Sequence, residues 1–512
     1  VLASWLGSRY PPLLVATASF SLGGLALAVS VAAFPRLTGL NYFSSGETFA
    51  GYILGASGLV ALFVLPPITL LGMALPAALQ AAAGGGAAGR VAAANTLAAA
   101  AGAMAAGFLL PPLLGLWPSF GLFVILFSLA GAVSLAREKH TAFAAALTVA
   151  GAVAAAVIVH GPTSANQDAS GVGLVRRWES AYGWVDVVRS RKDGSLEVRQ
   201  NLHYGHGSTA KAVREYRQGR LPLLLHPGPK EVAFLGLGTG LTAAPAAVDR
   251  GVEGVVVIEL IPEVVEASRL LASANLGVAD HPKVEVRVDD ARHHLLRTGR
   301  RFDAVVSDLF VPWESRAGYL YTVEFYETVR RRLKPGGLFC QWLALYQVGP
   351  EQLELIADSF SSVFPNTTLW WGQLHSRYPI VALVGSETPL AVDPGRLEER
   401  LDAQAGLPGG ADPDLRLPAD LPALYLGEWV RDRSRRLNTD EHPWLEFTAP
   451  VSQRSGRTLH GPALRAYFDG VFARLPSGGL RFGGELGALI RDGERRRALQ
   501  RLSLFGDVGP KP

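Results

Sequence analysis

Hydrophobic residues dominate the first 160 positions of the chain, in long runs separated by short polar segments. The first run, residues 11–34, carries no charged side chain. At 1.5 Å per residue it is long enough to cross the ~30 Å hydrocarbon core of a bilayer. Pro66 and Pro67 interrupt the second run, which predicts either one long kinked helix or two short ones. We therefore predict five or six membrane-spanning helices, from the runs at residues 11–34, 49–83, 91–116, 119–136 and 141–159.

The pattern changes after a polar linker. Short segments of alternating polar and apolar residues, divided by the turn Lys192-Asp193-Gly194, predict a small antiparallel sheet. Longer apolar segments of strand and helix type follow it. The pattern predicts a helical domain at residues 1–160, a linker at 161–170, a small β domain at 171–212, a Rossmann-like domain at 213–390 and a C-terminal extension at 391–512.

The sequence VAFLGLGTG at residues 232–240 predicts a strand, a tight turn and the start of a helix. Gly236, Gly238 and Gly240 allow positive φ and close approach of a ligand, and a helix start offers N–H groups to a polar ligand. Glu259 ends the next apolar strand roughly 20 residues later. A Rossmann-like unit places a carboxylate there to bind ribose hydroxyls. The spacing therefore predicts a nucleotide-binding turn.

Two further strands also end in acidic residues. The strand VEVRV leads into Asp289 and Asp290, and FDAVVSD ends in Asp308. Open α/β sheets bind ligands at the carboxyl ends of their strands, so these acids mark a binding edge. The fold class predicted is a multi-pass α-helical membrane domain followed by an α/β Rossmann-like domain of the class I methyltransferase type, with a small N-terminal β-sheet.

Composition narrows the choice of partners. The chain is 49% hydrophobic and 18% charged, and this apolar excess lies before residue 160. Net charge is +4, and the basic residues are scattered or paired with acids, so we expect no nucleic-acid partner. Cys340 is the single cysteine, which excludes an intrachain disulfide and a cysteine-based zinc site. We expect it to pack in the core, and we expect no metal.

Several motifs occur together in one order. They are WESAYG at residues 178–183, LPLLLHPGPKEVAFLGLGTG at 221–240 and NTDEHPWLEFTAP at 438–450. With the acids above, they resemble the spermidine synthases, or polyamine aminopropyltransferases. The resemblance is to bacterial membrane proteins that carry such a domain behind transmembrane helices, and in the enzyme domain it spans roughly residues 176–385.

The resemblance implies transfer of an aminopropyl group from decarboxylated S-adenosylmethionine, a co-substrate, to an amine, with release of methylthioadenosine. No prosthetic group is implied. Asp308 would be the catalytic base. The nucleoside would be bound by Gly236, Gly238, Gly240, Glu259, Asp289 and Asp290, and the amine by Glu179, Tyr182, His206, Tyr319 and Gln341.

One departure leaves the acceptor open. The second aspartate of the family's D-S-S-D-P motif is replaced by Val311. Two alternatives remain at this point. The first is a methyltransferase that uses S-adenosylmethionine itself, and the second is a non-catalytic, nucleoside-binding membrane transporter or sensor.

The expected partners are a polyamine or another amine, the lipid bilayer and, by the resemblance, a second copy in a homodimer. We expect a bacterial inner-membrane protein. Arg137 and Lys139 favour an external enzyme domain by the positive-inside rule. Substrate supply favours the cytoplasm, which we adopt. The chain starts with Val1 rather than Met, which is compatible with further helices upstream.

Overall fold

A computed structural model describes residues 9–40, 48–82, 86–159, 171–392, 394–403, 407–408, 412–475 and 480–482. The chain divides into two compact units. The first comprises Val1–Gly194 and Gln200–His203, and the second comprises Ser195–Arg199 and Tyr204–Pro512. The predicted linker at 161–170 lies outside the described residues. The other predicted domain boundaries stay predictions.

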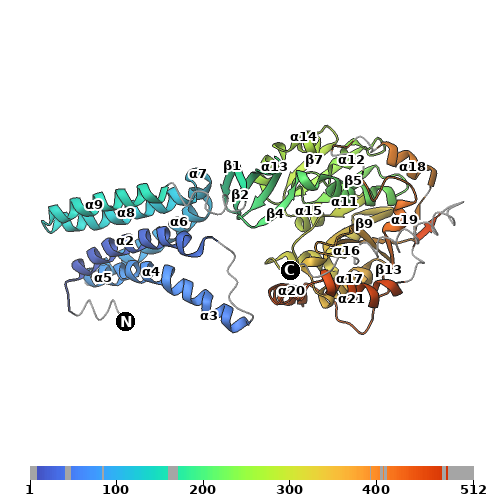
Figure 1. Cartoon of the computed structure of the whole chain (residues 1–512). Coiled ribbons are helices and arrows are strands. Elements are labelled where there is room, and N and C mark those ends of the chain that lie inside the picture. The colour runs from blue at the N-terminus through green and yellow to red at the C-terminus, as the bar shows by residue number, and fades with distance from the viewer. Residues whose placement is uncertain are drawn as a thin grey trace. The chain divides into compact units, whose positions relative to one another are not determined.

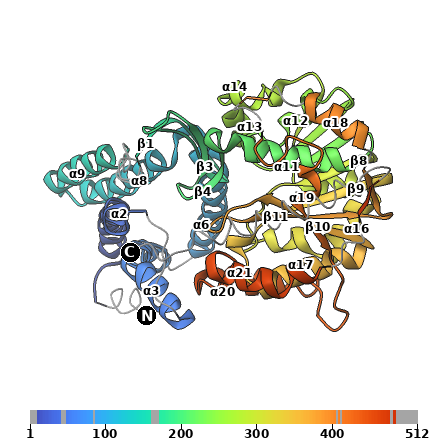
Figure 2. The same cartoon turned by 45° about the vertical axis from the view of Figure 1, so that its right-hand side comes forward.

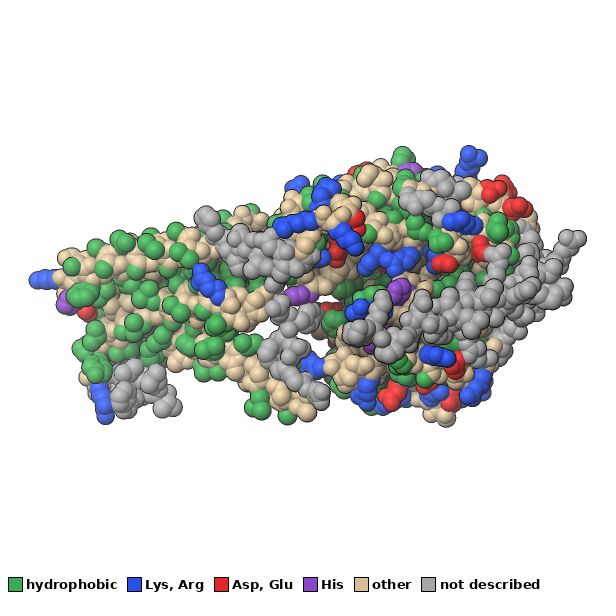
Figure 3. All heavy atoms as spheres, viewed as in Figure 1, with side chains coloured by type: hydrophobic (Ala, Val, Ile, Leu, Met, Phe, Trp, Pro, Cys, Tyr) green, Lys and Arg blue, Asp and Glu red, His purple; other side chains and the backbone are tan. Residues whose placement is uncertain are grey.

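Five helices of the first unit are long and apolar enough to cross a membrane, judged by length and composition. Hydrophobic side chains cover much of the visible face of this unit (Figure 3). All five predicted apolar runs are thus helical. The elements are α2 (Pro12–Thr38), α3 (Phe49–Leu59), η1 (Val60–Val64), α4 (Leu65–Gly72), α5 (Ala74–Ala81), α6 (Ala87–Met104), η2 (Ala105–Leu109), α7 (Leu110–Leu114), α8 (Leu116–Arg137) and α9 (Thr141–Val159).

Two of these helices are interrupted at proline pairs. A π-helical turn, η1, comes just before Pro66 and Pro67, and another, η2, comes just before Pro111 and Pro112. Proline lacks an N–H group and clashes with the preceding turn, so the hydrogen bonds shift to the wider π spacing. The segment Ala50–Ala81 is therefore one long helix that contains a π turn, rather than two short helices. The second π turn was not expected from the sequence.

Small residues let α2, α8 and α9 pack closely (Figure 1). A Cβ atom on Gly131 would lie 2.5 Å from the Ser21 hydroxyl oxygen, and one on Gly151 would lie 2.4 Å from the Ser128 hydroxyl oxygen. No side chain fits at either position without movement of its neighbour. Such contacts are typical of helices that associate in lipid, where small residues let the backbones approach.

The first unit also contains an antiparallel hairpin. Strands β1 (Val172–Ser180) and β2 (Gly183–Ser190) pair from Val172 opposite Ser190 to Ser180 opposite Gly183. This hairpin belongs to the predicted small sheet. Strands β3 (Leu196–Gln200) and β4 (Tyr204–Ser208) follow along the chain, and the division between the units falls within β3.

The second unit contains an eight-stranded sheet in the order β13-β10-β11-β9-β8-β5-β6-β7. Neighbouring strands from β7 through β9 are parallel, as the predicted Rossmann-like fold requires, and β9, β11, β10 and β13 pair antiparallel. A strand from the C-terminal extension thus completes the sheet. The bounds are β5 (Glu231–Leu235), β6 (Gly254–Glu259), β7 (Val284–Val288), β8 (Phe302–Ser307), β9 (Leu333–Ala344), β10 (Asn366–Gln373), β11 (Ile380–Ser386) and β13 (Tyr425–Glu428).

Helices cover both faces of this sheet, with α11 and α12 on one side and α16 and α17 on the other (Figure 2). The central strands are buried on both faces because of this cover. Cys340 in β9 is fully buried, as predicted. The helices are α11 (Ala212–Leu225), α12 (Ala244–Val248), α13 (Pro262–Arg269), α14 (Ala272–Asn275), α15 (Ala291–Arg297), α16 (Val323–Arg331), α17 (Pro350–Val363), α18 (Pro394–Ala403), α19 (Asp420–Leu424), α20 (Trp444–Arg454) and α21 (Gly461–Gly470).

Short elements complete the second unit. Strands β12 (Leu390–Val392) and β14 (Leu480–Phe482) form a separate parallel pair. The 3₁₀ turns are η3 (Thr209–Lys211), η4 (Val278–Asp280), η5 (Ala317–Tyr321), η6 (Leu345–Gln347) and η7 (Phe472–Arg474).

Candidate active site

The glycine turn lies at the carboxyl end of β5, as the sequence predicts. Gly236, Gly238 and Gly240 have φ values of 95°, 53° and 79°, in the left-handed region that favours glycine. A Cβ atom on Gly240 would also lie 2.6 Å from Cγ1 of Val278. The expected helix does not follow the turn directly, because the five-residue α12 begins only at Ala244. The turn does not supply the expected N–H groups either, because those of Gly236 and Gly240 bond the carbonyls of Ile258 and Leu237, and those of Leu237 and Gly238 bond Glu259.

Glu259 lies at the end of β6, and its carboxylate is hydrogen-bonded to the backbone of this turn. Its Oε2 accepts hydrogen bonds from the backbone N–H groups of Leu237 and Gly238, at 2.9 and 3.3 Å, and its Oε1 accepts one from Ile261 at 2.9 Å. Burial raises the pKa of Glu259, while these backbone N–H groups oppose the rise. Three backbone hydrogen bonds thus fix the orientation of this carboxylate at the glycine turn.

Asp308 follows β8, the strand next to β5 in the sheet. A Cβ atom on Gly236 would lie 3.8 Å from Cβ of Asp308, so the aspartate borders the glycine turn. Its Oδ1 accepts a 2.8 Å hydrogen bond from the Leu309 N–H group. Burial raises the pKa of Asp308, and the Glu259 charge adds to this, whereas bonds from Leu309 and the Thr242 hydroxyl lower it.

A third carboxylate, Glu215 in α11, was not predicted. It accepts hydrogen bonds from the Thr239 hydroxyl at 2.7 Å and from the Ser208 N–H group at 3.1 Å. Burial raises its pKa to about 7, the Asp308 charge adds to the rise, and the bonds from Thr239 and Ser208 oppose it. The sequence did not single it out, because α11 also contains Arg214, Arg217 and Arg220, and nothing in this pattern distinguishes a buried acid from a solvated one.

Two aromatic residues from β4 lie at the same edge. The Tyr204 hydroxyl donates to the Leu309 carbonyl at 3.3 Å, and its ring meets that of His206 edge-on at 4.8 Å. Burial raises the pKa of Tyr204, and the charges of Asp308 and Glu259 raise it further. Burial also lowers the pKa of His206 to about 4, so its ring is neutral near pH 7.

This geometry can be compared with known proteins. Residues 218–374 match the family model described as spermine/spermidine synthase domain. Residues 218–374 form a spermidine synthase-like domain. The chain is 31% identical over 251 residues to a polyamine aminopropyltransferase of Mycobacterium tuberculosis, covering 46% of this chain and 47% of that protein. It is 29% identical over 180 residues to polyamine aminopropyltransferase 2 of Hyperthermus butylicus, covering 35% of this chain and 58% of that one.

The chain therefore spans about half the length of these curated relatives. Among solved structures, a spermidine synthase in complex with the transition state analogue AdoDATO matches with a TM-score of 0.40 and 19% identity. That match covers 55% of this chain and 88% of the other.

Two acids, Asp289 and Asp290, follow β7 in the spermidine synthase-like domain, and Asp289 differs from Glu215, Glu259 and Asp308 because it forms an ion pair with an arginine. Asp289 pairs with Arg297. Burial raises the pKa of Asp289, but Arg297 outweighs this and the net pKa is lowered. Asp290 caps α15 by accepting a 2.8 Å hydrogen bond from the His293 N–H group. Their predicted contact with the nucleoside stays a prediction.

The predicted amine-binding residues fall in different places. Gln341 in β9 is fully buried beside the end of β8, and its side-chain amide donates to the Ser307 hydroxyl at 3.0 Å. Tyr319 lies in the loop after Asp308, where its carbonyl accepts a 3.1 Å hydrogen bond from Arg292. His206 lies at the glycine turn, where its carbonyl oxygen would be 3.1 Å from a Cβ atom on Gly238.

Glu179 and Tyr182 belong to the first unit. The Glu179 carboxylate accepts a hydrogen bond from the Leu116 N–H group at the start of α8. Tyr182 is exposed, and its carbonyl accepts a 3.1 Å hydrogen bond from Gln200. Their role in substrate binding stays a prediction. Within the described ranges, no group of three or more His, Cys, Asp or Glu side chains could hold a metal ion.

Proposed function

We propose that the protein transfers an aminopropyl group from decarboxylated S-adenosylmethionine to an amine acceptor and releases methylthioadenosine. The observation that carries this proposal is the trio Glu215, Glu259 and Asp308. Within the described part of the chain, none of these carboxylates forms an ion pair with Lys or Arg. Burial raises the pKa of all three. Lys211 and Arg214 interact with Glu215 electrostatically but do not form an ion pair with it. A site built from buried carboxylates without an ion-paired cation favours cationic ligands when the carboxylates are ionised.

Both proposed substrates are cations, a sulfonium nucleoside and a protonated amine. An alkylammonium has a pKa of roughly 10.4 in water and has no lone pair until it loses a proton. Asp308 is the acid nearest the glycine turn on the β8 side and has a raised pKa, which suits a general base. The amine nitrogen then attacks the aminopropyl carbon bound to sulfur. The carbon–sulfur bond breaks, its electron pair stays on sulfur, and the proton goes to Asp308.

The other residues of the site would position the two substrates relative to each other. Glu259 would accept hydrogen bonds from ribose hydroxyls, since its carboxylate is already oriented by three backbone bonds. In-line alignment of nitrogen, carbon and sulfur can lower the barrier by about 7 kcal/mol or more.

The acceptor would be recognised by residues other than the missing aspartate. Val311 is buried and apolar, so it offers no charge to an ammonium group. Glu215 provides a further carboxylate at the glycine turn, where it accepts a hydrogen bond from Thr239. Glu314 and Tyr204 interact electrostatically, which places Glu314 near the same edge. We infer an acceptor with at least one protonated amine, bound by Glu215 and Asp308.

Methyl transfer from S-adenosylmethionine is the nearest alternative. That substrate carries an additional carboxylate, which needs a cationic or polar partner near the glycine turn. The three acids there disfavour it electrostatically. The absence of Lys or Arg pairing to them within the described residues supports the decarboxylated nucleoside.

The five apolar helices would anchor this enzyme in a bilayer. We further infer an inner-membrane location with the spermidine synthase-like domain in the cytoplasm, where nucleoside and polyamines are supplied. Assembly as a homodimer is part of the same proposal.

Product analysis tests the proposed reaction. The detergent-purified protein would be supplied separately with decarboxylated and ordinary S-adenosylmethionine and with a panel of polyamines, followed by mass spectrometry. We expect methylthioadenosine and an amine extended by one aminopropyl group, only with the decarboxylated nucleoside. Adenosylhomocysteine would show methyl transfer instead, and absence of both products would favour a nucleoside-binding sensor or transporter.

A further inference from the structure

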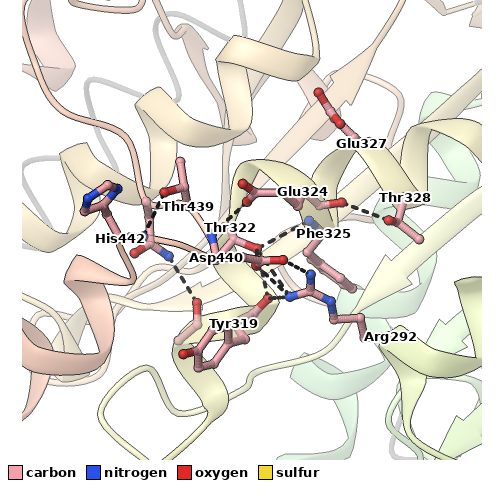
Figure 4. Close-up of polar contacts among 12 residues, drawn as sticks. Arg292, Tyr319, Thr322, Glu324, Phe325, Glu327, Thr328, Thr439, Asp440 and His442 are labelled. Atoms are coloured by element: carbon pink, nitrogen blue, oxygen red, sulfur yellow. Dashed lines mark hydrogen bonds and ion pairs between the residues drawn. The ribbon is translucent and has the colours of Figure 1, made fainter.

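A segment of the C-terminal extension contacts the loop that continues from Asp308. This clamp segment, residues 438–446, runs into the start of α20, and the β8–α16 loop comprises residues 308–322 (Figure 4). The contacts between them join positions more than one hundred residues apart in the sequence. The sequence motif NTDEHPWLE thus coincides with the clamp segment.

Asn438 makes the most buried of these contacts. It is fully buried, and its side-chain amide donates to the carbonyls of Gly318 and Tyr321, both at 3.1 Å. Its side-chain oxygen accepts a 3.0 Å bond from the Leu445 N–H group in the first turn of α20. Its own carbonyl accepts a 2.9 Å bond from the Val323 N–H group. A buried amide with all these bonds satisfied specifies one local arrangement.

Glu446 holds the middle of the loop. Its two carboxylate oxygens accept hydrogen bonds from the N–H groups of Arg316, at 2.6 Å, and Gly318, at 3.2 Å. Arg316 has a φ of 71°, a left-handed conformation that is unfavourable for a residue other than glycine. Surrounding bonds must stabilise such a residue. A Cβ atom on Gly318 would lie 2.8 Å from the Glu446 carboxylate, so glycine is needed for this approach.

Asp440 ties the end of the loop to α15. It accepts a 2.8 Å hydrogen bond from the Thr322 hydroxyl and a bidentate pair of bonds from Arg292 in α15. Figure 4 shows Arg292, Tyr319, Thr322 and Asp440 gathered around this contact. Arg292 also donates to the Tyr319 carbonyl.

A chain of hydrogen bonds connects the clamp segment to Asp308. Asn438 bonds the carbonyl of Tyr321, whose hydroxyl donates to the Phe310 carbonyl at 2.7 Å. The Phe310 N–H group in turn donates to the Asp308 carbonyl at 2.9 Å. We propose that the clamp segment is a positioning element that holds the β8–α16 loop, and with it Asp308, in the geometry needed to bind and deprotonate the acceptor amine. This proposal rests on the proposed aminopropyl transfer.

The test compares Glu446→Gln with Glu441→Gln in the full chain. Glu441 is an exposed acid of the same segment, and no hydrogen bond or ion pair to it is found among the described residues, so the matched change removes a charge without removing a loop contact. Hydrogen exchange of peptides covering residues 309–322 is measured first, without substrate. We expect faster exchange in Glu446→Gln and wild-type exchange in Glu441→Gln, because one acceptor for the loop N–H groups is lost.

Kinetics and binding complete the test. In Glu446→Gln we expect the amine kcat/KM to fall, by up to about 10²-fold for a displacement near 1 Å. Calorimetric affinity for methylthioadenosine should stay at the wild-type value, because the hydrogen bonds found for Glu259 among the described residues go to Leu237, Gly238 and Ile261 and not to the clamp segment. Asn438→Asp provides a second variant, which places a carboxylate against two carbonyls. It should lower the amine kcat/KM further, again without a change in the affinity for methylthioadenosine.

Equal exchange in the two glutamate variants would overturn the clamp proposal, whatever the activity. A similar loss of nucleoside affinity and amine kcat/KM would also overturn it, since that indicates general destabilisation. If the wild-type protein transfers no aminopropyl group, the proposed function fails instead. The clamp proposal is then tested by calorimetric binding of the amine in the presence of methylthioadenosine. It requires weaker amine binding in Glu446→Gln than in Glu441→Gln.

Discussion

The glycine-turn side and the β8–α16 loop side of the site are built in different ways. On the glycine-turn side, Glu259 bonds the Leu237 N–H group 22 residues away, and its other partners are as near in sequence. On the loop side, Arg316 bonds Glu446 130 positions away. One side is positioned by a single strand-turn-helix-strand unit, and the other depends on the C-terminal extension. The two sides should therefore respond separately to substitution.

The largest expected effect comes from Asp308, where the two sides meet. Asp308→Asn should lower kcat by about 10²–10⁴-fold, the usual contribution of a general base. Affinity for methylthioadenosine should change little, because Glu259 is held by its own backbone bonds. Single-turnover product formation and calorimetry measure the two quantities, with Glu441→Gln as the acid-to-amide control. Turnover at the wild-type rate in Asp308→Asn would exclude this role.

A single added methyl group should disrupt the packing of the glycine turn. Gly240→Ala adds a Cβ atom 2.6 Å from Val278 at a φ of 79°. We expect a loss of about 1–3 kcal/mol in the free energy of unfolding and weaker nucleoside binding. Thermal unfolding and calorimetry check this.

Gly277→Ala is the matched control for that change. Gly277 has a φ of 63° but no atom within 4 Å of the added methyl group. It carries the backbone strain without the clash, so its unfolding free energy should fall less and its nucleoside affinity should persist. Equal losses in both variants would mean that the close packing of the turn is unimportant.

The features that the sequence predicted are formed by residues that lie close together along the chain. The glycine turn and the three following strands that lead into acids lie in one contiguous stretch, so their shared edge follows from the parallel βαβ rule. For that reason the sequence placed Glu259 and Asp308 at this edge, where the structure has them. The apolar runs of the first unit were equally readable, because a membrane-length helix is defined by composition within a single segment.

Long-range contacts explain what was missed. Glu215 became part of the site only when α11 packed beside the glycine turn and Thr239 reached it. The motif around Asn438 was visible in the sequence, but its partners on the β8–α16 loop were not. Glu179 illustrates the opposite case, because a family motif marked it for substrate, whereas its described contact is the N–H group of Leu116.

The pH dependence of amine binding tests the role of Glu215 at the glycine-turn side. Glu215 has a pKa of about 7, raised mainly by burial. The proposed amine stays protonated below pH ~10, so its binding should strengthen as Glu215 loses its proton. We expect the amine Kd to increase on the order of tenfold or less between about pH 8 and pH 6. Glu215→Gln should bind weakly at both values and lose this dependence.

The stability of the unliganded protein should show the opposite trend. The pKa of Glu215 is higher in the folded state than its ordinary value, so its contribution is complete below that ordinary value and is lost as pH rises through about 7. The melting temperature of wild type relative to Glu215→Gln should therefore fall between about pH 5 and pH 8. A constant difference between the two proteins would contradict the buried setting of this acid.

The smallest expected effect is the coupling between Arg292 and Asp440. Their side chains are 19% and 36% exposed, so solvent screening reduces the value of this ion pair. A double-mutant cycle of Arg292→Gln and Asp440→Asn should give a coupling of about 0.5–1 kcal/mol in the free energy of unfolding. The same cycle measured on amine kcat/KM should give a coupling of the same sign, because α15 and the loop end meet at this pair. If coupling appears in unfolding but not in amine kcat/KM, Arg292 stabilises the fold without positioning the loop.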